Sequence, residues 1–242
     1  MTEAPLFEIF SSVQGEATRV GERHLFVRMA GCDLSCVFCD TQASRKIPEH
    51  ARVFLPGKVG EVRNPLSREE LDRWVTEIDA QCGPHHAISL TGGEPLLFVD
   101  YLLPLARGWR QRGFKILLET GGHRPHELER MLEETDIVMA DVKIASSAGF
   151  ATDRVVVEEF LWIAAKRECA VKVVVSAKTT EDEIKAVAAL VPPMAPLILQ
   201  PVTGTAFSPP TGDHLLLLQR AAMVRHENTR VIPQAHRILH VR

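Results

Sequence analysis

The sequence predicts an α/β fold in which a parallel β-sheet is covered by helices on its outer side. Short apolar runs rich in branched residues alternate about six times with longer amphipathic stretches, which is typical of strands joined by helical crossovers. With 242 residues, of which 45% are hydrophobic and 24% charged, the chain has the size and composition of a globular domain. We therefore expect residues 1–242 to form a single domain.

The apolar runs are interpreted as buried parallel strands. They cover residues 24–29, 87–91, 115–119, 137–141, 171–176, 197–200 and 230–233. The amphipathic stretches are interpreted as helices. They cover residues 67–81, 99–112, 125–134, 154–167, 180–190 and 212–225. Ser67 with Glu70, and Thr180 with Glu183, have the spacing of a capping box, which supports the starts of the first and fifth helices.

One segment, residues 43–65, interrupts this alternation. It contains Pro48, Pro56, Gly57 and Pro65 and has little hydrophobic periodicity. This composition predicts a long surface loop, inserted after the first predicted strand and the cysteines that follow it. Long loops beside a site often cover it.

Polar and glycine-rich segments follow several of the predicted strands. They are residues 91–94, 119–122 and 141–143, then Ser176, then residues 200–201. A parallel sheet, whether open or curled toward a barrel, binds ligands at the carboxyl ends of its strands. We therefore expect these segments to surround one site.

Charge and hydropathy argue against two classes of partner. The net charge is −3 and the pI is near 6.4, without the basic excess of a nucleic-acid-binding protein. No apolar run approaches the roughly 18 residues that span a membrane. The first ten residues include Glu3 and Glu8 and lack the apolar core of a signal peptide. We expect a cytoplasmic protein with neither nucleic acid nor a membrane as partner.

Three of the five cysteines, Cys32, Cys36 and Cys39, lie within eight residues after the first predicted strand. Clustered cysteines in a reducing compartment bind metal, and thiolates at short spacing hold iron–sulfur clusters. Three ligands to four irons leave one iron open for chemistry. Zinc with a distant fourth ligand is the alternative, although zinc favours paired spacings. Cys82 and Cys169 are expected to be buried apolar residues.

The Cys-x3-Cys-x2-Cys spacing resembles the signature of radical S-adenosylmethionine (SAM) enzymes. In that superfamily the open iron of a [4Fe–4S] cluster chelates SAM, which is cleaved to methionine and a 5′-deoxyadenosyl radical. Residues 91–95, Thr-Gly-Gly-Glu-Pro, resemble the superfamily's second motif, which meets the SAM amino group. The resemblance implies a partial (β/α)6-type radical SAM barrel.

A narrower resemblance covers most of the chain. Residues 8–16, 26–32, 39–41 and 234–237 are similar to segments of the 7-carboxy-7-deazaguanine synthase family. This implies a lyase that contracts the ring of 6-carboxy-5,6,7,8-tetrahydropterin, with loss of ammonia, in queuosine and 7-deazapurine biosynthesis. It also implies Mg²⁺ beside the cluster and SAM, a homodimer, and an electron donor such as flavodoxin or ferredoxin.

By position, the resemblance assigns most of the contacts, including residues 200–203 beside the SAM pocket, and Ser176 is added because it ends the fifth predicted strand. The SAM site comprises Phe38, Gly92, Gly93, Glu94, Asp141, Val142, Lys143, Ser176 and Gln200. The substrate site comprises Val13, Gln14, Gly15, Arg28, Thr91 and His236. The metal ligands are Cys32, Cys36 and Cys39 for the cluster and Thr41 for Mg²⁺. No side chain is assigned a catalytic role, because the cluster and SAM carry the chemistry.

Two other functions are kept as alternatives. A glycyl-radical activase shares the cysteine spacing but acts on a protein, and it needs neither residues 14–16 nor Thr41. A non-enzymatic zinc-binding module would use the cysteines without iron. For single residues, Arg28 could be a buried ion-pair partner, Asp141 and Lys143 could pair with helix charges, and His236 could be structural.

Overall fold

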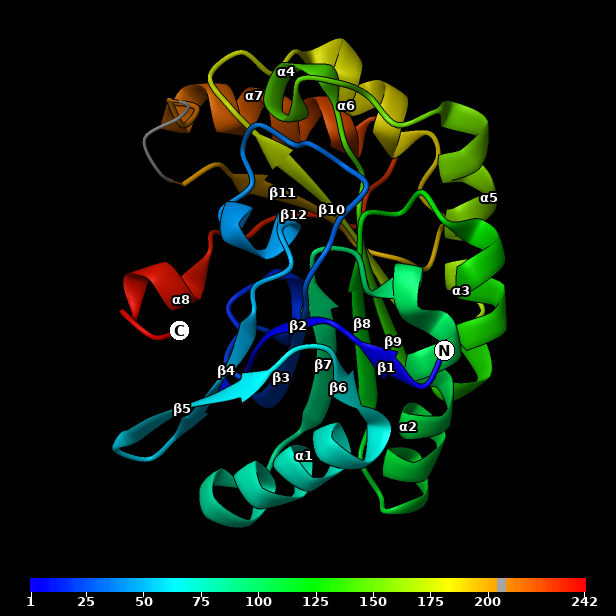
Figure 1. Cartoon of the computed structure of the whole chain (residues 1–242). Helices are drawn as coiled ribbons and strands as arrows, with labels where there is room; N and C mark the ends of the chain where they lie inside the picture. Colours follow the sequence, from blue (N-terminus) through cyan, green and yellow to red (C-terminus); the bar gives the residue numbers. More distant parts are fainter. Residues whose placement is uncertain (204–207) are drawn as a thin grey trace.

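The computed structural model describes residues 1–203 and 208–242 and has the expected α/β architecture. In this part of the chain, a ten-stranded sheet runs in the order β12-β11-β10-β9-β8-β7-β3-β2-β4-β5 (Figure 1). Its strands are β2 (Leu6–Val13), β3 (Arg23–Met29), β4 (His50–Leu55), β5 (Lys58–Arg63), β7 (Ala87–Gly92), β8 (Ile116–Thr120), β9 (Ile137–Asp141), β10 (Glu168–Val175), β11 (Leu197–Pro201) and β12 (Thr229–Val231). The short strands β1 (Glu3–Ala4) and β6 (Leu66–Ser67) form a separate pair.

From β3 to β12, every neighbouring pair of strands is parallel. These seven strands are the ones predicted from the apolar runs, with ends that differ by at most three residues. Strand β2 was not predicted, and it pairs antiparallel with β3. The parallel arrangement brings the carboxyl ends of the central strands to one edge of the sheet, as expected.

The helices are α1 (Arg68–Cys82), α2 (Val99–Gln111), α3 (Pro125–Met131), α4 (Ala145–Ala148), α5 (Arg154–Ala164), α6 (Glu181–Ala188), α7 (Gly212–Met223) and α8 (Ala235–Ile238). Six of the helices lie at the predicted places, and the short helices α4 and α8 were not predicted. Short 3-10 helices lie at Ala17–Arg19, Gln42–Arg45, Pro95–Phe98 and Leu132–Glu134. Both predicted capping boxes form, at Ser67 with Glu70 and at Thr180 with Glu183. In Figure 1, α8 and the C-terminus lie apart from the other helices, on the side of β2 and β4.

The segment 43–65 is not a loop, and that expectation was wrong. Strands β4 and β5 form a hairpin that extends the sheet beyond β2. Its turn consists of Pro56 and Gly57, and Gly57 has φ +68°, which suits the two central positions of a type II turn. Ala51 and Val53 are buried against the core. The proline and glycine therefore mark one tight turn between two strands.

Two apolar layers lie on the two sides of the parallel sheet. The larger layer packs the helices against the sheet, with Trp109, Tyr101 and Phe160 almost fully buried. The smaller layer lies on the other side, here called the inner face. Its members are Ala17, Ala87, Leu117, Ile137, Met139, Ala170 and Ile198. Because side chains alternate along a strand, the inner face also receives the polar residues at the strand ends.

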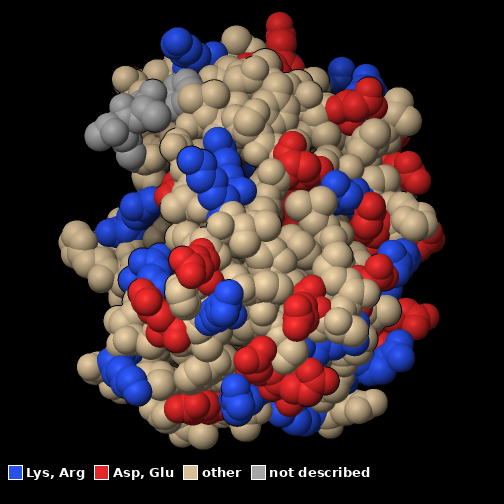
Figure 2. Space-filling view, in the orientation of Figure 1, with Lys and Arg blue, Asp and Glu red and all other residues tan. Residues whose placement is uncertain are grey.

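The surface carries mixed charges on the face seen in Figure 2, where acidic and basic side chains are interspersed. Among the residues that the structure describes, no helix is both long enough and apolar enough to cross a membrane.

Candidate active site

One cavity of about 540 Å³ opens at the carboxyl ends of the central strands. Polar side chains from six neighbouring strands line its wall. They are Arg28, Thr91, Glu119, Asp141, Lys172 and Gln200. Each lies on the inner face, beyond the apolar layer that closes the bottom of the sheet. In β10, for example, Ala170 belongs to that layer while Lys172, two residues on, reaches the cavity.

The three clustered cysteines lie on the loop after β3, and all three line the cavity. This loop is held from several sides: the Gly31 amide donates to the Ser44 carbonyl at 2.7 Å, and the Val37 amide donates to the Ala148 carbonyl at 3.0 Å. The guanidinium of Arg45 donates to the Cys36 carbonyl. Asp33 accepts from Arg124 at 2.7 Å. The loop is therefore fixed to the protein on both sides of the thiols.

All five cysteines are free thiols. Cys169 is buried in the core, and burial raises the pKa of its thiol to about 12. Cys82 ends α1 and packs against the same core. The expectation of a buried apolar residue is confirmed for Cys169, whereas Cys82 packs against the core but is only half-buried.

Burial raises the pKa of both the Cys32 and the Cys36 thiol. In the described ranges, a group of three candidate ligand atoms within 4.8 Å of one another is formed by Glu16, Asp40 and His236.

The Gly92–Gly93 pair packs the loop after β7 onto the cysteine loop. The Gly93 amide donates to the Met29 carbonyl at 3.1 Å, and the Glu94 amide donates to the Gly31 carbonyl at 2.9 Å. A Cβ on Gly93 would lie 1.8 Å from the Gly31 carbonyl oxygen. Gly92 has φ +120°, and its Cβ would meet Met29 backbone atoms. Both positions therefore require glycine in this chain, because their backbone lies directly against the backbone of residues 28–31.

Glu94 is buried, and its carboxylate already has protein partners. It accepts from the Thr120 hydroxyl at 2.8 Å, from the Gly121 amide at 2.8 Å and from the Leu96 amide at 3.0 Å. Burial raises the pKa of this carboxyl. Glu94 therefore joins the loops after β7 and β8 as well as lining the cavity.

Most of the residues assigned to SAM line the cavity. Phe38, Gly92, Gly93, Glu94, Asp141, Lys143 and Gln200 do so. The Oε1 atom of Gln200 is buried and accepts no hydrogen bond from any residue that the structure describes, which leaves it available to a ligand's donor. Val142 and Ser176 are buried and do not line the cavity. The Ser176 hydroxyl instead donates to the Ser146 carbonyl.

All six residues assigned to substrate line the cavity: Val13, Gln14, Gly15, Arg28, Thr91 and His236. The Arg28 guanidinium pairs with Glu8 at 3.1 Å and lies 5.6 Å from the centre of the Phe10 ring. The expected ion-pair alternative for Arg28 is therefore present, and Arg28 still borders the cavity. Similarly, Asp141 pairs with Lys143 at 2.9 Å, although Lys143 is on the same segment rather than on a helix.

Further polar residues line the cavity without having been assigned a role, among them Asp40, Glu119, Lys172 and Gln234. Glu119 stands at a strand end, which was a usable signal. Lys172 is a lone charge inside an apolar strand, and the two-residue alternation of β10 places it on the inner face. Nothing in the local sequence indicates that Gln234 reaches the cavity, because this depends on how the C-terminal segment packs.

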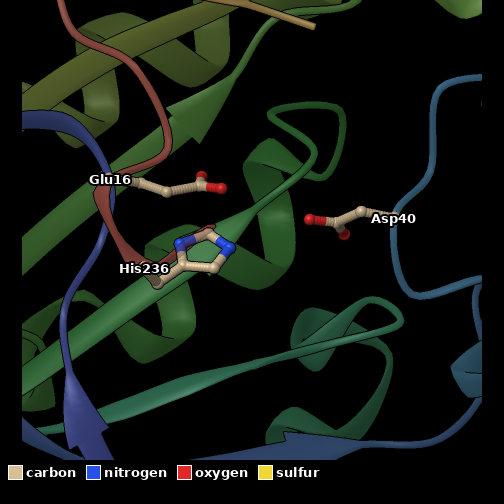
Figure 3. Close-up of side chains that lie close together, drawn as sticks. All are labelled: Glu16, Asp40 and His236. Atoms are coloured by element: carbon tan, nitrogen blue, oxygen red, sulfur yellow. The ribbon is translucent and has the colours of Figure 1, made fainter. Parts of the chain in front are cut away.

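Glu16, Asp40 and His236 meet at the wall of the cavity, where the C-terminal segment approaches the turn after β2. Figure 3 shows the carboxylates of Glu16 and Asp40 pointing toward each other from opposite sides, with the His236 ring below Glu16 in this view. Gln234 donates to Glu16 Oε1 at 2.6 Å and to Asp40 Oδ2 at 3.0 Å. The Ala235 amide donates to the Gly15 carbonyl at 2.8 Å. The C-terminal segment is thus bound to the turn beside the cavity.

Thr41 adds an oxygen next to this cluster. Its hydroxyl donates to Asp40 Oδ1 at 2.9 Å and accepts from Arg28 at 3.4 Å. Oxygen ligands of this kind are what Mg²⁺ prefers, so the donor set at Thr41 and Asp40 fits the metal expected there.

The chain matches proteins of known activity over its whole length. Residues 26–189 match the Radical SAM superfamily. The chain is 35% identical to the 7-carboxy-7-deazaguanine synthase of Geobacter sulfurreducens, over 98% of this chain and 97% of the relative. It is 32% identical to the enzyme of the same name from Methanothermobacter thermautotrophicus, over 100% and 99%. The fold matches QueE from Escherichia coli with a TM-score of 0.63 at 23% identity, over 97% and 95% of the two chains.

Proposed function

The chain belongs to the 7-carboxy-7-deazaguanine synthase family of the radical SAM superfamily, and from this we propose that it converts 6-carboxy-5,6,7,8-tetrahydropterin to 7-carboxy-7-deazaguanine. It is a ring-contracting radical SAM enzyme of 7-deazapurine biosynthesis. Relatives of this name match nearly the full length of the chain, which favours this function over the activase and the zinc-binding module.

One structural observation supports the proposal most strongly. The three cysteines and all six residues assigned to the pterin line the same cavity. A radical reaction requires the substrate close to the group that generates the radical, because the radical must meet one hydrogen atom and no other. A cavity that the cysteines share with the residues assigned to the pterin meets that requirement. A metal site with a purely structural role would not need such a cavity.

The family works with a [4Fe–4S] cluster and SAM, which together supply one electron and a hydrogen-abstracting radical. We propose that Cys32, Cys36 and Cys39 hold the cluster through their thiolates. All three are free of disulfide bonds and lie on one fixed loop. The residues assigned to SAM that line the cavity would surround the cofactor. Among them, Gln200 offers a buried oxygen that lacks a protein donor in the described part of the chain, which suits a ligand with hydroxyl or amino groups.

Elsewhere in the same cavity, the chain's own side chains suit a small acid with a polar ring. Arg28 can receive a carboxylate through the guanidinium edge that its Glu8 contact leaves free. Gln14 and Thr91 present an amide and a hydroxyl beside the cavity. Burial lowers the pKa of His236, so this imidazole is neutral near pH 7 and offers one donor and one acceptor.

We propose that Mg²⁺ binds at Thr41, where Asp40 supplies a second oxygen. Thr41→Val removes the hydroxyl while keeping the shape of the side chain. We expect it to raise the Mg²⁺ concentration required for half-maximal activity, measured by titrating the metal. Thr76→Val on the exposed side of α1 is the control and should leave the titration unchanged. An unchanged titration in Thr41→Val would remove Thr41 from the metal site.

The remaining expectations from the sequence belong to the same proposal. They are an electron donor such as flavodoxin or ferredoxin, a homodimeric assembly and a cytoplasmic location. The mixed charges visible in Figure 2 and the family's small-molecule chemistry support the absence of a nucleic-acid partner.

The function is tested by an anaerobic assay of the reconstituted protein with SAM, a chemical reductant, Mg²⁺ and the carboxytetrahydropterin. We expect a deazaguanine acid to form, identified by mass spectrometry. It should accompany the cleavage of SAM through the 5′-deoxyadenosyl radical. Arg28→Gln should lose product while still binding iron. If no deazaguanine acid forms while a characterised relative is active under the same conditions, the proposed substrate is wrong.

A further inference from the structure

The ammonium group of Lys172 lies between two carboxylates from different parts of the chain. It forms a short ion pair with Glu16 Oε2 and lies 3.2 Å from Asp141 Oδ2. Glu16 belongs to the turn after β2, whereas Asp141 ends β9 and is the strand neighbour of Lys172. The three side chains are only 13–15% exposed. This one cation therefore joins two walls of the cavity.

From Asp141 the contacts continue into the half of the cavity assigned to SAM. The other carboxylate oxygen, Oδ1, lies 2.9 Å from the Lys143 ammonium. That ammonium lies 5.0 Å from the centre of the Phe38 ring. In the sequence, Phe38 stands between Cys36 and Cys39. A ligand that touches Phe38, Lys143 or Asp141 will therefore alter how strongly Asp141 holds Lys172.

From Glu16 the contacts continue into the half assigned to the pterin. Gln234 donates to Glu16 Oε1 at 2.6 Å and to Asp40 at 3.0 Å. The His236 ring lies beside both carboxylates (Figure 3). The two acidic groups already have the Lys172 ammonium and the Gln234 amide as partners, which makes this cluster a hydrogen-bonded junction.

In the bridge itself, two cations, Lys143 and Lys172, face two anions, Glu16 and Asp141. The carboxylates of Asp40 and Glu119 lie beside it. Burial by itself would lower the pKa of Lys172, yet Asp141 and Glu16 hold it well above the ordinary value, so the cation is present at neutral pH. Inside a protein, charges interact more strongly than in water. A change at one carboxylate is therefore transmitted to the other through the shared ammonium.

We propose that Lys172 is a positioning residue that couples the two halves of the cavity, so that SAM and the pterin each strengthen the binding of the other. This inference rests on the proposed function for the identity of the two ligands. The coupling arises because a ligand that contacts Asp141 or Glu16 changes how strongly that carboxylate holds Lys172, and the shared ammonium passes the change to the other carboxylate. It is reciprocal by linkage.

Calorimetry on the anaerobic, cluster-loaded protein tests this without reductant, so that neither ligand is consumed. SAM is titrated with and without saturating 6-carboxytetrahydropterin. We expect the wild-type protein to bind SAM at least about fivefold more tightly when the pterin is present, the lower end of typical allosteric coupling. If the pterin binds but the SAM affinity is the same in both titrations, the coupling proposal is wrong. If the pterin does not bind at all, the proposed function fails instead.

Lys172→Met keeps the length of the apolar stem and removes the charge. We expect the coupling factor to fall toward one, and the ratio of 5′-deoxyadenosine to deazaguanine product to rise under turnover. Lys166→Met, at an exposed lysine outside the cavity, should keep both values. A Lys172→Met protein with wild-type coupling would overturn the proposal.

A second variant removes the carboxylate that Lys172→Met leaves unpaired. If Lys172→Met alone fails to load iron or to fold, the double variant Lys172→Met/Glu16→Gln is measured in its place. The double variant removes one cation and one anion and so restores the charge balance. It should also lack coupling. In a double-mutant cycle, Glu16→Gln should change the coupling factor in the wild-type background and leave it unchanged in the Lys172→Met background. Independent effects of the two changes would contradict a shared bridge.

Discussion

The side-chain amide of Gln14 donates to the Glu119 carboxylate at 2.7 Å, joining residues 105 positions apart. The other carboxylate oxygen accepts from the Thr91 hydroxyl at 3.1 Å. This carboxyl ties the turn after β2 to the ends of β7 and β8, two of the places where substrate contacts are proposed. Burial raises the pKa of Glu119, and the nearby negative charge of Glu16 adds to the effect.

Glu119→Gln is expected to stabilise the protein increasingly as pH rises. A carboxyl whose folded pKa is above its unfolded value contributes its full stability below the unfolded pKa, and that contribution is lost as pH rises through the folded pKa. Glutamine imitates the protonated form and does not titrate. The difference in melting temperature between Glu119→Gln and wild type should therefore be small at pH 5 and grow toward pH 8.

Glu158→Gln is the matched control for this change, because Glu158 is exposed on α5. Its melting temperature should track that of wild type at every pH. A Glu119→Gln difference that stayed constant with pH would show that the buried carboxyl has the same proton affinity in the folded and unfolded chain.

Cys36→Ala is expected to lose the cluster. A [4Fe–4S] centre held by three thiolates should give about four irons per chain in the wild-type protein, and removal of one ligand should bring iron below about one. SAM cleavage should be lost with it. Cys82→Ala changes a cysteine that packs against the core and should keep both iron and the brown colour. Retention of four irons in Cys36→Ala would exclude this residue as a ligand.

The parallel sheet was predictable because its strands are buried on both sides. In β10, residues of both faces are apolar apart from Lys172 and the first residue, Glu168, and the residue types favour a strand. The helices between the strands have one apolar stripe and, in α1 and α6, a capping box that fixes the start. These signals are local, and tertiary contacts do not change them.

The additions at the edge of the sheet were less visible in the sequence. Strand β2 contains Glu8 and two serines, which weaken its apolar pattern. The glutamate is stabilised by Arg28, Arg52 and Arg242, which come from three distant segments. In the same way, the ion pairs of Lys172 depend on strand register and on the turn after β2. Pairings of this kind are set by the fold, and a single sequence does not reveal them.

Gly93→Ala is expected to displace the cysteine loop. Its Cβ would lie 1.8 Å from the Gly31 carbonyl oxygen, and because both partners are backbone, one loop must move. We expect iron content to fall while the far-ultraviolet circular dichroism stays near wild type. Gly108→Ala in α2, where an added Cβ has open space, should instead stabilise the protein by roughly 0.5–1 kcal/mol. Normal iron loading in Gly93→Ala would show that the two loops separate without cost.

Gly15→Ala should weaken binding of the pterin while sparing SAM. The new Cβ would lie 2.2 Å from His236 Nδ1, so the C-terminal segment must shift, and the KM for the pterin should rise about tenfold to a hundredfold. Gly60→Ala in β5, where the nearest atom is 3.8 Å away, is the control. If the clash is with His236, whose Cβ as well as its ring lies within 2.7 Å of the added atom, adding His236→Gly to Gly15→Ala should leave the KM no worse than in His236→Gly alone. Additive losses would mean that Gly15 acts through its own backbone, and the proposed contact with His236 would then be irrelevant to binding.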